Sequence, residues 1–136
     1  MPLVRISLPE GKSEDEIRAI SEGVHQAMVD TIGVPQEDHF QIITEHAPTR
    51  LLSHKSYLGV SRSDGVLIIQ ITLHSGRSDE KKQLLYRQIA DNLNSTSGVR
   101  KEDIMVVLSE NESGDWSFGN GEAQMLTQGI KPHWGA

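Results

Sequence analysis

The chain has 136 residues, a length that suits one domain with a single hydrophobic core. Its formal net charge of −6 argues against a nucleic-acid-binding protein, which needs a basic face. No apolar run reaches the length of a membrane span, and the first residues lack the apolar core of a signal peptide. The absence of cysteine excludes disulfides and a thiolate nucleophile. We therefore expect a cytoplasmic protein without a nucleic-acid or membrane partner.

A β-strand is predicted at the start of the chain, because apolar and polar residues alternate from Val4 to Leu8. Pro2 precedes this strand. If Met1 is removed, the ring nitrogen of Pro2 becomes a free secondary amine. A terminal amine titrates at roughly pH 7.7–8, and burial lowers that value, so the group can exchange a proton near neutral pH. Position alone also allows Pro2 to be no more than a chain start.

Two amphipathic helices are predicted. The first begins at the capping box Ser13–Glu16, carries apolar residues at three- and four-residue steps, and ends at Gly33. The second begins after Ser78 and ends at Gly98. Its expected buried stripe consists of Leu84, Leu85, Ile89 and Leu93.

Three further strands are predicted, at residues 39–44, 66–73 and 104–108. In the first of them Phe40 and Ile42 share a face. The apolar run 66–73 is typical of a central strand. The connection 46–65 is expected to be irregular, with a short strand at residues 57–60.

The chain contains an internal repeat, since residues 5–45 align with residues 70–110 without a gap. Identical pairs occur at turns, caps and strand ends, and they include Ile6/Ile71, Leu8/Leu73, Gly11/Gly76, Ser13/Ser78, Gly33/Gly98, Val34/Val99, Glu37/Glu102, Asp38/Asp103 and Glu45/Glu110. We expect a duplicated β-α-β unit with parallel strands and right-handed crossovers. The predicted fold is a two-layer α+β domain over residues 1–136, with a four-stranded mixed sheet and both helices on one face. A symmetric partner is expected to cover the other face.

Arg77 and Asp38 are candidate functional residues, because Arg77 could help to bind an anion and Asp38 could interact with an amine or a water. Arg77 directly precedes a helix, where its guanidinium and the helix amides could hold an anion. Lys12 occupies the same place in the first half, so a solvated arginine explains the pattern equally well. Asp38 could stabilise a nearby amine or hold a water. Asp103 is its repeat mate, so a turn-capping role would explain both carboxylates.

Histidines and aromatic residues supply the remaining candidates. His74 ends the central strand and could bind a substrate carboxylate or move a proton, or be a plain surface histidine. Trp116 and Phe118 lie in a glycine-containing segment that suits a C-terminal hairpin within residues 111–136. They could wall an apolar pocket around Pro2 or cover the sheet. No metal site is predicted, since metal-ligand spacing is lacking among His25, His39, His46, His54 and His133.

These features resemble the tautomerase superfamily, and most closely the malonate semialdehyde decarboxylase family. The resemblance extends from Pro2 to about Gly129. It is carried by Pro2-Leu3, Gly33-Val34-Pro35 with Asp38, Gly98-Val99 through Asp103, and Asp115-Trp116-Ser117-Phe118-Gly119 with Ala123-Gln124 and Leu126. It implies a homotrimer that uses an amino-terminal proline and no cofactor.

The resemblance also assigns roles to individual residues. The proline is cationic in the decarboxylases and neutral in the simple tautomerases, and the carboxylate matching Asp38 assists it. Arg77 matches one of two arginines that bind the substrate carboxylate. The second arginine is missing, because the segment 73–77 is one residue longer than the family pattern, and His74 lies near the vacant place. The family's apolar wall is matched by Trp116, Phe118, Met125 and Leu126.

The predicted function is that of an enzyme, an isomerase or carbon–carbon lyase, acting on a small oxo acid. The reaction is decarboxylation, hydration or keto–enol tautomerisation, with Pro2 as the general acid or base. The alternative is a trimeric binding or structural protein without turnover. A retained Met1 would favour that alternative, because acylation abolishes the basicity of Pro2.

Overall fold

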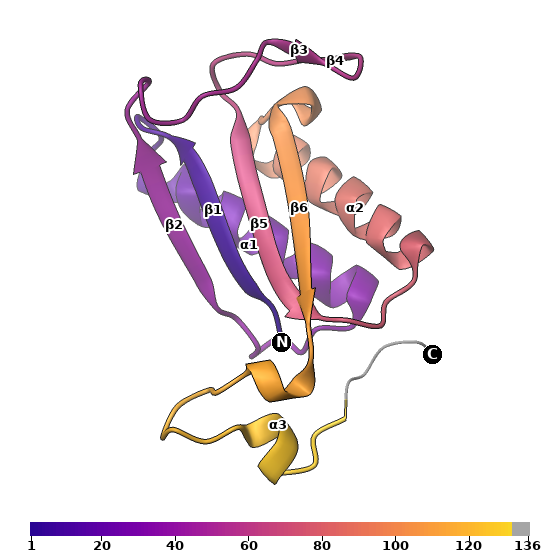
Figure 1. Ribbon diagram of the computed structural model, residues 1–136. Coiled ribbons are helices and arrows are strands. Elements are labelled where there is room, and N and C mark those ends of the chain that lie inside the picture. Colours follow the sequence, from indigo (N-terminus) through magenta and orange to yellow (C-terminus); the bar gives the residue numbers. More distant parts are fainter. Residues whose placement is uncertain (132–136) are drawn as a thin grey trace.

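The computed structural model describes residues 1–131, which form a four-stranded sheet with two long helices behind one face (Figure 1). The elements are β1 Leu3–Pro9, α1 Glu14–Ile32, β2 Gln41–His46, β3 Ser56–Tyr57, β4 Val60–Ser61, β5 Leu67–His74, α2 Asp79–Ser97, β6 Ile104–Asn111 and α3 Gln124–Thr127, with 3-10 turns η1 Lys101–Asp103 and η2 Ser113–Asp115.

The sheet confirms the duplicated α+β architecture. Its strand order is β2-β1-β5-β6, with β1 parallel to β2, β5 parallel to β6, and the two units joined by antiparallel β1 and β5. The repeat offset maps the ends of α1 onto the ends of α2. Leu3 pairs with Thr72, so the start of β1 adjoins the end of β5. The chain start, the entry to β2 and the exits of β5 and β6 therefore meet at one end of the sheet (Figure 1).

Local sequence signals set both helices as predicted. The Ser13 hydroxyl accepts from the Glu16 amide at 3.1 Å, and the Glu16 carboxylate accepts from the Ser13 amide at 3.3 Å. Gly33 and Gly98 end the helices in the left-handed region, with φ of 70° and 66°. The alternate residues of β1 and β5 that face the helices form one buried core with them.

Several boundaries differ from the prediction. β2 begins two residues later than expected. The single strand expected at residues 57–60 is instead the hairpin β3–β4, which turns at Leu58 and Gly59 with positive φ values of 51° and 77°. Leu84 was expected in the core but is 46% exposed. Consecutive helical residues point about 100° apart, and Leu85 takes the core-facing direction.

The prediction of a C-terminal hairpin is wrong for the part of the tail that the structure describes. The only regular elements in residues 112–131 are η2 and α3. Glu112 and Asp115 close a turn by reciprocal side-chain and backbone bonds. The Gln124 side chain accepts from the Phe118 amide and donates to the Gly119 carbonyl, both at 2.8 Å. These bonds fold the glycine-rich stretch onto α3. They also occupy the Phe118 amide and the Gly119 carbonyl, which would otherwise be available for pairing with another strand. Residues 132–136 of the predicted tail lie outside the described residues.

The sheet face opposite the helices carries apolar side chains that are exposed in the single chain. They are contributed by Leu3, Ile42, Met105 and Val107. Within residues 1–131, no helix is long and apolar enough to cross a membrane.

Candidate active site

The amino terminus and Asp38 form an ion pair at the end of the sheet where β1 starts. The Met1 amino nitrogen lies 2.9 Å from Asp38 Oδ2. Pro2 is buried beside it. The Asp38 amide donates to the Pro35 carbonyl at 3.0 Å, which closes the turn that presents the carboxylate. The structure therefore brings the predicted Pro2 and Asp38 together.

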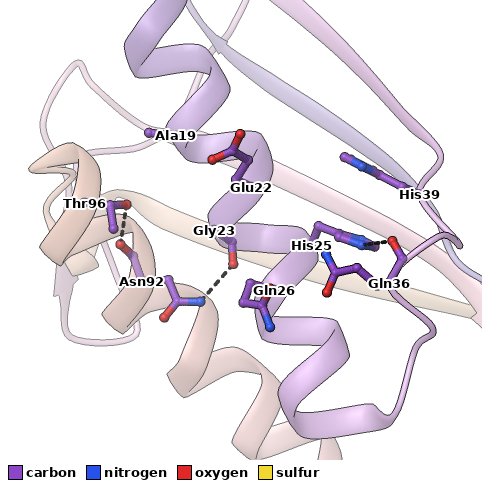
Figure 2. A pocket seen from close by; sticks show the side chains of 9 residues that line it. All are labelled: Ala19, Glu22, Gly23, His25, Gln26, Gln36, His39, Asn92 and Thr96. Carbon is purple, nitrogen blue, oxygen red and sulfur yellow. Dashed lines mark hydrogen bonds between the residues drawn. The ribbon is translucent and has the colours of Figure 1, made fainter.

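The loop that carries Asp38 is fixed to α1 by His25 (Figure 2). His25 Nε2 donates to the Gln36 carbonyl at 2.8 Å, and the His25 ring stacks on His39 with centroids 4.2 Å apart. Because Gln36 and His39 flank Asp38, these contacts hold the carboxylate in place. They border a cavity of about 640 Å³ between α1 and α2, which contains no predicted catalytic residue. The contribution of His25 was not predicted, because its partners come from a loop whose path the sequence does not reveal.

Arg77 is buried, with 7% of its surface exposed, so the alternative of a solvated arginine is wrong. Its Nη1 donates to the His74 carbonyl at 3.1 Å. Burial lowers the pKa of the guanidinium, while the charges of Glu110 and Asp38 partly oppose that effect. Arginine nevertheless stays protonated in proteins. A buried cation thus lies within electrostatic reach of the Asp38 carboxylate.

Glu110 is shared between Arg77 and a second cation. Lys82 Nζ lies 3.0 Å from Glu110 Oε1. This hydrogen bond is the main reason that the pKa of Lys82 is raised. Glu110 therefore interacts with two cations: it pairs with Lys82, and its charge also favours the protonated form of Arg77.

His74 is buried at 8% exposure and faces the segment after β6. Its Nδ1 lies 2.7 Å from the Ser75 carbonyl, which only accepts, so Nδ1 carries the proton. Its Nε2 forms a hydrogen bond with the Ser113 hydroxyl at 3.0 Å and lies 3.9 Å from Glu112 Oε2. His74 is therefore not a plain surface histidine, and its ring contacts the chain itself.

An apolar pocket of about 340 Å³ opens beside the amino terminus. Its lining consists of Met1, Asp38, Phe40, Phe118, Gln124 and Ile130. Trp116 stacks on Phe118, with centroids 5.6 Å apart and planes at 5°, and Phe40 lies 6.1 Å from Phe118. Of the two aromatic residues predicted to wall the pocket, Phe118 lines it, whereas Trp116 does not line it and stacks on Phe118.

The other predicted wall residues lie differently. Met125 is 2% exposed and Leu126 is 60% exposed, and neither lines this pocket. Phe40, Gln124 and Ile130 were not predicted to line it. Phe40 had a usable signal, since it lies two residues after Asp38 and therefore enters the same end of the sheet.

Within residues 1–131, no group of three or more histidines or carboxylates is arranged to hold a metal ion. His133 lies outside the described residues. The chemistry available to the described pocket is that of an amine and a carboxylate beside apolar walls. Arg77 does not line the pocket, and it reaches Asp38 electrostatically.

Comparison with known proteins assigns the family. Two family models, both described as tautomerase enzyme, match residues 38–119 and 2–60. Probable tautomerase YusQ of Bacillus subtilis (strain 168) is 43% identical over 126 residues, covering 93% of this chain and 99% of YusQ. FG41 malonate semialdehyde decarboxylase inhibited by 3-bromopropiolate has a TM-score of 0.88 at 38% identity, covering 94% of this chain and 97% of that structure. A wild-type symmetric trimer of fused 4-OT shares the fold, with a TM-score of 0.76 at 22% identity, covering 92% of this chain and 98% of that one. The chain belongs to the tautomerase superfamily, with malonate semialdehyde decarboxylase among its similar structures.

Proposed function

We propose that this chain is a cofactor-free enzyme that acts on a small oxo acid with Pro2 as its general acid or base. The observation that carries the proposal is a terminal amine 2.9 Å from Asp38 beside an apolar pocket. Met1 supplies that amine in the structure. While Met1 is attached, the ring nitrogen of Pro2 is an amide and has no proton to exchange. Removal of Met1 would turn it into the terminal amine.

The first version of the reaction uses a cationic Pro2 on a 3-oxo acid, as in malonate semialdehyde decarboxylase. Asp38 favours the cation because an opposite charge at hydrogen-bond distance stabilises it. Arg77 binds the substrate carboxylate, and the Pro2 ammonium protonates the 3-carbonyl oxygen as the bond to the carboxylate breaks. The bonding pair passes into the enol and carbon dioxide leaves. The enol carbon then takes a proton from water, while the enol hydroxyl returns its proton to the Pro2 nitrogen, which restores the ammonium. In a hydration the Asp38 carboxylate would orient a water molecule.

The second version uses a neutral Pro2 as the base in a keto–enol exchange of a 2-oxo acid such as phenylpyruvate. The proline nitrogen would take the enol hydroxyl proton and deliver a proton to the adjacent carbon. The apolar walls support this version, because Phe40 and Phe118 would contact an apolar substituent. A direct contact between His74 and the substrate carboxylate would require its ring to leave Ser113.

The test is a proton-NMR assay of Met-free protein against a panel of oxo acids and haloacrylates. Pro2→Ala should abolish turnover, while Pro9→Ala, which alters the far end of β1, should leave it unchanged. Turnover by Pro2→Ala at the normal rate would refute both versions. Activity that falls as pH rises past the amine's titration indicates an acid, and activity that rises indicates a base.

A trimeric binding or structural protein without turnover is the rival proposal. It applies if Met1 is retained, because Pro2 then carries an amide nitrogen that cannot act as an acid or base. Mass spectrometry of the protein from its own cells separates the two. A retained Met1 supports the binding role, and its removal supports the enzyme.

The proposal includes a homotrimer in the cytoplasm. The exposed apolar residues of the outer sheet face support it, as does the shared fold with the fused 4-OT trimer. Val107→Arg places a charge on that face and should dissociate the trimer. Leu84→Arg is the matched control, since Leu84 is an exposed leucine on the helix layer. Light scattering should give three chain masses of 15.1 kDa for the control and one for Val107→Arg.

A further inference from the structure

The aromatic wall has no strand pairing to hold it in the described chain, so other contacts must fix its position. Residues 112–131 contain only η2 and α3 as regular elements. Trp116 and Phe118 nevertheless stack with nearly parallel planes. The question is which residues connect this segment to the end of the sheet.

A polar cluster makes that connection between the exit of β5 and the exit of β6. The Ser75 hydroxyl donates to Glu112 Oε1 at 2.6 Å, and the Ser75 amide donates to the Asn111 carbonyl at 2.8 Å. The Asn111 side chain accepts from the Trp116 indole nitrogen at 2.7 Å. Asn111 therefore accepts hydrogen bonds both from the Trp116 indole and from Ser75, the residue that follows β5.

His74 lies at the centre of this cluster. Its Nδ1 donates to the Ser75 carbonyl, and its Nε2 forms a hydrogen bond with the Ser113 hydroxyl. Its own carbonyl accepts from Arg77 Nη1 at 3.1 Å. One residue thus contacts the guanidinium through its backbone and the wall segment through its ring.

We propose that His74 is a positioning residue that fixes the aromatic wall relative to Arg77. Its ring holds η2, which orients Trp116 and through it Phe118, while its carbonyl holds the guanidinium. The inference rests on the proposed function in so far as it assigns this geometry to substrate binding.

The experiment follows Trp116 directly. The chain has two tryptophans, so Trp134→Phe leaves Trp116 as the only emitter. In that background, His74→Ala and Ser113→Ala should each shift the emission to the red and increase quenching by acrylamide. The double variant should resemble His74→Ala alone, because both substitutions remove the same hydrogen bond, between His74 Nε2 and the Ser113 hydroxyl. His74→Gln should restore the emission, since its amide can accept from Ser113. His54→Ala is the control, because its contacts lie with Ser56 at the β3 end of the sheet.

Kinetics with the oxo acid that the enzyme turns over test the functional role. Each single variant should lower kcat/KM by about fivefold, the effect of one hydrogen bond. If His74→Ala raises KM while Ser113→Ala does not, and the emission is unchanged, His74 binds the substrate directly and the proposal is wrong. If His74→Ala fails to fold, Ser113→Ala decides with the same two readouts. If no oxo acid is turned over, the proposed function fails, and the emission still confirms or refutes the link.

Discussion

Replacing Arg77 with methionine separates a catalytic guanidinium from one that only stabilises the fold. Methionine has a similar length but no charge. Removing one partner of a buried charge pair costs about 3–5 kcal/mol, so loss of the contact with a substrate carboxylate should lower kcat/KM by roughly 10²–10³-fold. The loss should appear with every carboxylate substrate.

The same substitution should reduce thermal stability. Arg77 is buried, its Nη1 donates to the His74 carbonyl, and the charges of Glu110 and Asp38 favour its cation. Removing one partner of a buried charge pair is destabilising because the remaining charge loses its compensation, although burial lowers the pKa of Arg77 and offsets part of that loss. We therefore expect a lower Tm by circular dichroism.

Arg100→Met is the matched control at the other end of the sheet. Arg100 is half-exposed and pairs with Glu102 at 3.1 Å, an arrangement that contributes about 1 kcal/mol or less. Its loss should leave turnover unchanged. The prediction for Arg77 is contradicted if Arg77→Met keeps its kcat/KM, or if its Tm does not fall below that of Arg100→Met.

Two further substitutions test the surroundings of the site. Lys82→Met should remove an alkaline step in stability: the pKa of Lys82 is raised by Glu110, so its contribution is complete below the ordinary value of 10.5 and is lost as pH rises through the higher folded value. Urea unfolding at several pH values checks this, and an unchanged alkaline step in the variant would contradict it. His25→Ala should cost about 1–3 kcal/mol of stability and lower kcat more than KM, because the loop bearing Asp38 loses its attachment to α1. Equal kcat in steady-state assays would contradict the second prediction.

The helices and the parallel strands of each repeat unit could be predicted because their signals are local and occur twice. A capping box at Ser13 and glycines at both helix ends define the elements within a few residues. The repeat then restricts the sheet to two parallel pairs. Burial of Arg77 could not be predicted in the same way. The sequence pattern was equally compatible with a solvated arginine, and only the packing of β5, β6 and the first turn of α2 excludes it.

The tail shows a different limit of sequence patterns. Its glycines and aromatic residues are typical of a hairpin, yet one side chain, Gln124, binds the backbone at Phe118 and Gly119 and thereby replaces strand pairing. Such bonds have no periodicity in the sequence. Phe118 lines the pocket as predicted, but Trp116 does not, and the hairpin predicted to carry both is absent from residues 112–131.

The repeat explains why Asp38 faces an amine. Its mate Asp103 accepts from the Ser63 amide at 2.8 Å and from the Ser63 hydroxyl at 2.6 Å, which holds the segment that enters β5. Asp38 accepts from the terminal amine of Met1, which belongs to the corresponding segment that enters β1. Both carboxylates thus hold the entry to the first strand of their own unit. The duplicated role that seemed to argue against a function for Asp38 is what places a carboxylate at the amino terminus, where its partner is an ionisable amine.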